Sequence, residues 1–404
     1  YQLDVNNAFL HRDLHEEVYM KMPEGIPNPH NKVCKLQKSL YDLKQASRQW
    51  HSKLANFLKN QGYTQSKNDY SLFLKQTQNH LTIVAVYVDD ILLTGSNPEE
   101  IQALKHNLHA AFGIKDLGLL NYFLGFEISH LPNGITLTQR KFTQDLLKEA
   151  GYIDAKPTAT PLPINCKLLA NTGVPLTDPT VYRTYIGKLN FLANTRPDIS
   201  FAVQTLSQFM QQPTSAHMAA LEHLLKYISG TSGQGILLQA TDSLKLKAYS
   251  DSDWASCPMT RRSVTGYVVL LGNSPISWKS KKQSTIARSS AEAEYRAMAQ
   301  AAAEVTWLVS LLQELGVSNT KPVTLHCDNQ SALHIARNPI FHERTKHIEV
   351  DCHFTRDKVM EGLLQLSYLP TQSQLADVLT KILPSQQHWH LLHKLGMFPQ
   401  HPKL

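Results

Sequence analysis

The sequence predicts an α+β protein of two or three domains, and three observations support this prediction. Its 404 residues, 42% hydrophobic and 18% charged, are enough to build more than one core. Residues 81–93 form two strand-like apolar runs that meet at a pair of acids, and residues 98–112 have helical periodicity. From residue 244 onward, the pattern is three strands, a helix, a strand, a helix, a strand and a helix, which favours a sheet covered by helices.

The pair Asp89-Asp90 is the most informative feature of the chain. It interrupts an apolar run over residues 81–88 that resumes at residues 91–93, so the two acids are expected at the tip of a β-hairpin. Two enclosed carboxylates repel each other and usually hold a cation. Mg²⁺ suits such sites, because it binds one or two carboxylates together with water and phosphates. A solvated turn is the alternative, which the apolar flanks disfavour.

Four further motifs surround this pair. Residues 1–10 read YQLDVNNAFL, with Asp4 in a strand-like run, and residues 41–50 read YDLKQASRQW. Residues 115–118 read KDLG, and residues 122–125 read YFLG. In this order, the motifs resemble the reverse transcriptase of copia-type LTR retrotransposons.

The resemblance implies a polymerase palm, which is part of the right-hand fold. Asp4, Asp89 and Asp90 would bind two Mg²⁺ ions, with Mn²⁺ as an alternative, and the partners would be an RNA template, a DNA primer and deoxynucleoside triphosphates. The remaining implied contacts to nucleotide or template involve Phe9 as a steric gate against the ribose 2′-OH, Lys44, Gln45, Tyr87, and Lys115 as a proton donor to pyrophosphate. Core packing is the alternative role for Phe9.

Two departures and one missing region argue against polymerase activity. Asp42 stands where the family has Gly, and Ser47 where it has Pro. A carboxylate beside the incoming triphosphate is expected to be unfavourable. The chain also begins inside the first motif, so we expect a polyprotein fragment without the fingers region. The alternative function is a catalytically inactive remnant that only binds nucleic acid.

The middle of the chain predicts a linker followed by helices. Residues 154–163 contain three prolines, and residues 182–238 are mostly helical in pattern and include TRPDI at residues 195–199. This part resembles the connection of the same family. The predicted domains are residues 1–153 (palm and part of the thumb), 154–243 (linker and connection), 244–383 (ribonuclease H-like) and 384–404 (C-terminal tail).

The order of elements after residue 244 is that of an α/β ribonuclease H-like domain. Strands are expected over residues 244–251, 264–271, 283–287, 322–328 and 363–369. The first and the fourth can pair in parallel, which would bring Asp251 and Asp328 to the same edge of the sheet. Ser289 and Glu292 form a capping-box pattern at the start of the long helix.

This helix and the last motif supply two more acids. With Glu292 used in the cap, Glu294 is left to face the site, and the resemblance to SSxEAEYxA agrees. Asp377 in LADVLTK matches the fourth acid of the family, while Asp253 is an alternative to Asp251. Four such carboxylates can hold two Mg²⁺ ions that cut the RNA strand of an RNA–DNA hybrid, which is recognised by its 2′-OH groups and groove shape.

Histidine usage is less informative. Many ribonucleases H place a His before the last acid, but residues 369–374 contain none. His347 is a possible substitute. The three histidines His388, His390 and His393 are expected on a surface helix rather than at a metal, because neither an acid nor a Cys lies near them in the sequence.

Composition indicates the cellular compartment and the kind of partner. Five scattered cysteines without C-x-x-C pairs favour a reducing compartment, and the lack of a signal pattern or membrane-length apolar run predicts a protein that is neither secreted nor bound to a membrane. A cytoplasmic virus-like particle or the nucleus is expected. The net charge of +7 fits a polyanionic partner, as does the basic segment 32–53, in which Tyr41 and Trp50 are interleaved. A homo- or hetero-oligomer with other polyprotein products is possible.

Overall fold

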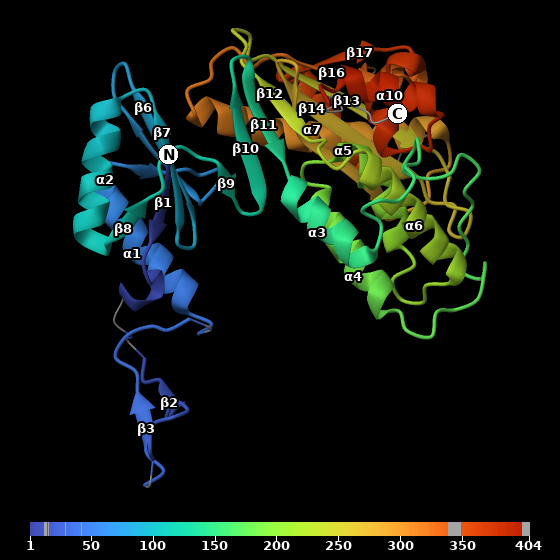
Figure 1. The fold of residues 1–404 in the computed structure, drawn as a ribbon. Helices are drawn as coiled ribbons and strands as arrows, with labels where there is room; N and C mark the ends of the chain where they lie inside the picture. Colours follow the sequence, from blue (N-terminus) through green and yellow to red (C-terminus); the bar gives the residue numbers. More distant parts are fainter. Residues whose placement is uncertain (12–13, 15, 29, 42, 338–348, 398–404) are drawn as a thin grey trace. The chain divides into compact units, whose positions relative to one another are not determined.

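The computed structural model of the protein describes residues 1–11, 14, 16–28, 30–41, 43–337 and 349–397. The chain divides into two compact units, Tyr1–Leu120 with Ser310–Val317, and Asn121–Val309 with Ser318–Leu404 (Figure 1). Every helix in the described ranges is too short or too polar to cross a membrane.

The first unit is built on a six-stranded antiparallel sheet with strand order β4-β5-β6-β7-β1-β8. Its elements are β1 (Gln2–Val5), η1 (Ala8–His11), β2 (Tyr19–Lys21), β3 (Val33–Lys35), α1 (Ala46–Asn60), β4 (Thr64–Gln65), β5 (Leu72–Gln76), β6 (Leu81–Tyr87), β7 (Asp90–Gly95), α2 (Pro98–Phe112) and β8 (Ile114–Asp116). Strands β2 and β3 form a separate hairpin.

Helices α1 and α2 share one core with this sheet. Trp50 of α1 and Phe112 of α2 are buried and meet edge to face, with ring centroids 5.2 Å apart. Asn97 caps α2 by accepting a hydrogen bond from the backbone N–H of Glu100 at 3.2 Å, and Gly113 ends the helix in the left-handed region.

The second unit contains a four-stranded antiparallel sheet, a group of helices and a five-stranded mixed sheet. Its elements are β9 (Tyr122–Phe123), β10 (Phe126–Leu131), β11 (Gly134–Thr138), α3 (Arg140–Ala150), α4 (Thr180–Leu192), α5 (Pro197–Ser207), α6 (Ser215–Gly230), β12 (Ile236–Gln239), β13 (Leu246–Asp253), β14 (Val264–Leu271), β15 (Ser274–Lys282), α7 (Ser290–Glu314, up to Val309), β16 (Val323–Cys327), α8 (Gln330–Arg337), α9 (Glu349–Met360), β17 (Leu364–Tyr368), η3 (Thr371–Ser373), η4 (Leu375–Leu379) and α10 (Ser385–Lys394).

The five-stranded sheet has the order β15-β14-β13-β16-β17. Its first three strands are antiparallel neighbours, whereas β13 pairs in parallel with β16, and β16 in parallel with β17. The strand and helix order from residue 244 onward follows the prediction, except that two helices, α8 and α9, lie between β16 and β17. The parallel pairing brings the carboxyl ends of β13 and β16 to one edge of the sheet.

The predicted strand over residues 283–287 is wrong. The third strand of the sheet is β15, which ends at Lys282. It lies at the edge of the sheet, where Pro275 near its start costs no interior hydrogen bond and its lysines can point to solvent. Proline and lysine are rare in interior strands, so the sequence pattern of residues 274–282 did not indicate a strand.

The predicted boundary at residue 153 does not coincide with the division of the two units. Strands β9 to β11 belong to the second unit, because β11 pairs with β12 from Gly134 opposite Gln239 to Leu137 opposite Ile236. The two chains approach closely there, since a Cβ on Gly134 would lie 2.1 Å from the carbonyl oxygen of Leu238. A pairing between residues a hundred positions apart leaves no local signal in the sequence.

Within the predicted C-terminal tail, residues 384–404, the structure has a helix, α10 (Ser385–Lys394). Helix α10 buries Leu391 and Leu392 against Val268 and Leu270 of β14. His388 is buried as well, which corrects the surface position expected for it, whereas His390 and His393 are exposed.

A buried polar network ties α5, α6 and α10 together. The guanidinium of Arg196 donates two hydrogen bonds to the Asp198 carboxylate, at 2.9 and 2.7 Å, and a further one to the carbonyl of Thr231 at 2.9 Å. The Tyr227 hydroxyl donates to Asp198 at 2.8 Å and lies 3.0 Å from Nε2 of His388. Burial lowers the pKa of His388 to about 4, so its ring is neutral at pH 7.

Replacing Asp198 with Ala should therefore destabilise the second unit by about 3–5 kcal/mol, because the Arg196 charge would stay buried without its partner. Urea denaturation followed by circular dichroism would measure the loss. The control is Glu149→Ala, which removes the partner of Lys188 at the surface and should cost no more than about 1 kcal/mol. Equal losses in the two variants would contradict the role of the network.

Candidate active sites

The first candidate site lies where β6, β7 and β1 of the first unit meet. As the sequence predicts, Asp89 lies in the turn of the β6–β7 hairpin, and Asp90 begins β7. In the register of β1, Asp4 is directly opposite Asp90 on one side and opposite Lys115 of β8 on the other. The backbone carbonyl of Asp89 accepts a hydrogen bond from the N–H of Val5 at 2.9 Å. The sheet thus brings the three predicted acids together.

The electrostatics of these acids agree with their proximity. The pKa of the Asp4 carboxyl is raised by burial and by the charges of Asp89 and Asp90, and the ammonium of Lys115 opposes this shift. Gln2 donates a hydrogen bond to the Asp90 carboxylate at 3.1 Å. Three carboxylates brought together in this way form a set of oxygen ligands suited to Mg²⁺.

The hairpin turn has a strained backbone that Trp50 holds in place. Val88 has φ of +55°, a left-handed conformation that is unfavourable for a β-branched residue. The indole N–H of Trp50 donates a hydrogen bond of 2.6 Å to the Val88 carbonyl. Trp50 is 1% exposed, so the interpretation of this side chain as part of a nucleic-acid-binding surface is wrong, and it fixes the turn from the core instead.

Phe9, the predicted steric gate, is 8% exposed and belongs to the hydrophobic core of the first unit. The ring of Phe9 packs against that of Tyr41, with centroids 4.6 Å apart. Burial and the charges of Asp89 and Asp4 raise the pKa of Tyr41, which places this pair of rings beside the acids.

The remaining side chains predicted to face nucleotide or template are exposed or half-buried. Tyr87, Lys44 and Lys115 are exposed, and Gln45 is half-buried at the start of α1. Ser47 lies exposed in the first turn of that helix, while Asp42 lies outside the described residues.

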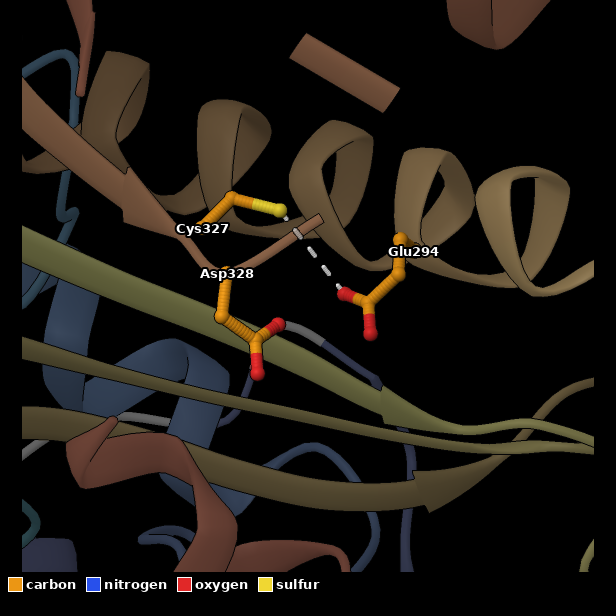
Figure 2. Close-up of side chains that lie close together, drawn as sticks. All are labelled: Glu294, Cys327 and Asp328. Carbon is orange, nitrogen blue, oxygen red and sulfur yellow. Dashed lines mark hydrogen bonds between the residues drawn. The ribbon is translucent and has the colours of Figure 1, made fainter. Parts of the chain in front are cut away.

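The second candidate site lies at the edge of the five-stranded sheet. Asp251 is buried near the end of β13, and Asp328 directly follows the parallel strand β16. Glu294, near the start of α7, is 5% exposed and points toward Cys327 and Asp328 (Figure 2). Ligand atoms of Glu294, Cys327 and Asp328 all lie within 4.8 Å of one another.

The fourth acid, Asp377, reaches this edge on the 3₁₀ helix η4. Gln374, just before the helix, donates a hydrogen bond to the carbonyl of Ser250 at 3.0 Å. Gly266 of β14 lets η4 lie close to the sheet, because a Cβ there would come within 2.6 Å of Thr380 and 2.9 Å of Leu379. This close approach is a packing requirement that the sequence pattern does not show.

Lys381 is a residue of this site that the sequence interpretation missed. Its Nζ lies 3.1 Å from Asp251 and 2.9 Å from Asp377, and the hydroxyl of Thr380 also donates to Asp251. The ammonium thus neutralises part of the charge of two acids that come from distant segments. Its spacing of four residues after Asp377 was a signal that could have found it.

Burial raises the pKa of Asp251, Glu294 and Asp377. In Glu294, the charges of Asp251 and Asp328 add to the effect. Burial and the charge of Asp251 raise the pKa of Asp377 to about 7, although Lys381 acts in the opposite direction. Such mutual repulsion fits an arrangement of carboxylates that holds divalent cations.

One alternative for this site, Asp253, lies within the described residues. Asp253 is half-buried two residues beyond Asp251 and accepts a hydrogen bond from Ser256, whereas Asp251 is the acid that Lys381 and Thr380 contact. His347 lies outside the described residues. His388 belongs to the buried network with Tyr227.

The two sheets and their edge acids together define the fold class of a reverse transcriptase palm followed by a ribonuclease H-like domain. The family model "Reverse transcriptase (RNA-dependent DNA polymerase)" matches residues 1–164. The chain belongs to the family of copia-type retrotransposon Pol polyproteins.

Three comparisons support this assignment. The retrovirus-related Pol polyprotein from transposon RE1 of Arabidopsis thaliana is 46% identical over 398 residues, which cover 98% of this chain and 27% of that protein. The putative transposon Ty5-1 protein of Saccharomyces cerevisiae is 33% identical over 75% of this chain and 100% of its own length. The structure of foamy viral protease-reverse transcriptase with double-stranded DNA matches with a TM-score of 0.53 and 14% identity, over 92% of this chain and 56% of that chain, which shows the fold.

The chain spans about a third or less of the length of the Pol polyproteins of transposons RE1, RE2 and TNT 1-94 that it matches, with 27%, 28% and 31% covered. The comparisons therefore establish the family and the fold.

Raising the pH from about 4 to about 7 should lower the free energy of unfolding of the metal-free protein through Asp377. Its carboxyl stays protonated up to about pH 7 in the folded protein but ionises near 3.8 in the unfolded chain, so the unfolded state gains from ionisation in this range. Denaturant midpoints measured in EDTA across this range should fall less steeply in Asp377→Asn. The control is the exposed Asp242→Asn, which should keep the slope of the parent protein. An unchanged slope in Asp377→Asn would contradict the prediction.

Proposed function

We propose that the chain is an RNA-directed DNA polymerase with ribonuclease H activity from a retrotransposon polyprotein. The observation that carries this proposal is the convergence of Asp251, Glu294, Asp328 and Asp377 on one edge of a sheet. Four acids from separate segments repel one another, and bringing them together is favourable chiefly where cations are bound. The partners are an RNA template, a DNA primer, deoxynucleoside triphosphates and an RNA–DNA hybrid.

In the nuclease half, residues of the chain position the four carboxylates. Glu294 and Asp328 approach from α7 and from the end of β16, while Lys381 and Thr380 orient Asp251 and Asp377. These four carboxylates would hold two Mg²⁺ or Mn²⁺ ions. The hybrid would be distinguished from DNA by the 2′-OH groups of its RNA strand.

In the polymerase half, Asp4, Asp89 and Asp90 would hold the metal ions beside the incoming nucleotide. Phe9, which packs against Tyr41 next to these acids, is in a position to exclude a ribose 2′-OH. The exposed side chains of Lys44, Tyr87 and Lys115, together with Gln45, would contact template and triphosphate. In both halves, the bound ions would activate the attacking oxygen and stabilise charge on the leaving group.

Replacing Asp328 with Asn should abolish cleavage of a labelled RNA–DNA hybrid in Mg²⁺ and leave hybrid affinity nearly unchanged, because a neutral amide is a poor ligand for Mg²⁺. Asp251→Asn should have the same effect. The matched control is Asp253→Asn, two residues further along β13, which should retain cleavage.

The outcomes of this experiment separate the competing interpretations. Cleavage that persists in Asp328→Asn would show that the assigned site is wrong. Loss in Asp253→Asn with retention in Asp251→Asn would exchange the roles of these two acids. A folded parent protein that binds the hybrid without cutting it would support a catalytically inactive, nucleic-acid-binding remnant.

The polymerase half is tested by Phe9→Val. The smaller side chain should raise incorporation of ribonucleotides relative to deoxyribonucleotides, measured by primer extension on an RNA template. The control is Phe57→Val, which removes a core aromatic that packs against Phe112 rather than against Tyr41. A Phe9→Val enzyme with unchanged sugar selectivity would assign Phe9 to core packing alone.

A further inference from the structure

The four acids at the edge of the five-stranded sheet, Asp251, Glu294, Asp328 and Asp377, form two electrostatically different halves. Lys381 forms ion pairs with Asp251 and Asp377. Within the described ranges, no ion pair includes Glu294 or Asp328, although Glu294 is 5% exposed. A buried carboxylate without a counter-ion is unfavourable, so the half formed by Glu294 and Asp328 is where added positive charge would stabilise the fold most.

A thiol lies in that same half. Cys327, the last residue of β16, is fully buried, and its Sγ faces the Glu294 carboxylate at 3.9 Å (Figure 2). Asp328 completes a group whose ligand atoms all lie within 4.8 Å of one another. Because the sulfur comes from a strand and the two carboxylates come from a helix and a loop, the three ligands approach from different directions.

The distance between the Cys327 sulfur and the Glu294 carboxylate is close to that in a tetrahedral site for a thiophilic metal. With zinc–sulfur and zinc–oxygen bonds of about 2.3 and about 2.0 Å, a sulfur and an oxygen ligand of a tetrahedral ion lie about 3.5 Å apart. The observed 3.9 Å between Sγ of Cys327 and Oε2 of Glu294 requires only a small adjustment. Mg²⁺ prefers oxygen ligands and would not use the sulfur, whereas Zn²⁺ and Cd²⁺ would.

We propose that Glu294, Cys327 and Asp328 form a binding site for a thiophilic divalent cation of the Zn²⁺ or Cd²⁺ type, and that its occupation inhibits the nuclease. The bond forms between the metal and Sγ of Cys327, whose proton leaves to solvent, and no electron is transferred. Inhibition follows because Glu294 and Asp328 can no longer hold Mg²⁺. This second part rests on the proposed nuclease function, while the binding itself does not.

Cys257 provides a matched control within the same unit. It is also buried, but its Sγ lies 2.8 Å from the ammonium of Lys282 and near the amide oxygen of Gln208 rather than beside a pair of acids. The positive charge of Lys282 would repel a divalent cation. Removal of this cysteine should therefore leave the proposed site intact.

Binding is tested by titrating the purified chain with Cd²⁺ alone and recording the ultraviolet thiolate-to-cadmium charge-transfer absorption. The parent protein and Cys257→Ser should show a saturable band that is absent in Cys327→Ser. Glu294→Gln should keep the thiol but weaken Cd²⁺ binding by at least about tenfold, as expected for a weakened metal site. A band of equal size and affinity in Cys327→Ser would overturn the proposal, as would the lack of a band in the parent protein.

The effect on the nuclease is tested separately by adding Zn²⁺ to cleavage reactions that contain excess Mg²⁺. Cys327→Ser should need at least about tenfold more Zn²⁺ for half inhibition than the parent protein, with Cys257→Ser unchanged. Equal sensitivity would overturn the regulatory part. If the parent protein cuts no hybrid, the proposed function fails while the Cd²⁺ result still decides the binding site. Circular dichroism checks the folding of Cys327→Ser, and Cys327→Ala replaces it if it does not fold.

Discussion

The electrostatic repulsion between carboxylates that the two sheets bring together is the constraint on which the rest of this structure depends. Asp4 meets Asp90 across paired strands, and Asp251 and Glu294 are buried within reach of further acids. Burial raises the pKa of Asp4, Asp251 and Glu294, and the charges of neighbouring acids raise it further. A scaffold that tolerates such groups must hold them rigidly and supply partial neutralisation.

The two units hold their acids in place by different interactions. In the first unit, Trp50 fixes the left-handed turn at Val88 from the core by a hydrogen bond to the Val88 carbonyl. In the second unit, Lys381 joins Asp251 to Asp377, and Gly266 allows η4 to lie against β14. The buried Arg196–Asp198 pair and its contact through Tyr227 to His388 tie α10 to the helices beside it.

Local patterns in the sequence predicted much of this fold. The alternating or continuous apolar runs gave β6, β7, β14, β16 and β17, and Asn97 with Pro98 gave the start of α2, since these signals depend on residues close together in the chain. The edge strand β15 was missed because proline and lysine are tolerated at a sheet edge. The pairing of β11 with β12 was missed because it joins segments a hundred residues apart.

The sequence by itself determined the family and the acids proposed for the two sites, because ordered motifs and strand ends are local features. Only the tertiary structure decided what surrounds those acids: Lys381 between Asp251 and Asp377, Cys327 against Glu294, and Trp50 in the core instead of on a binding surface. The physical reason is that charge neutralisation, close packing and metal-ligand geometry depend on distances between atoms. Those distances follow from strand pairing and helix packing, which the order of residues along the chain does not state.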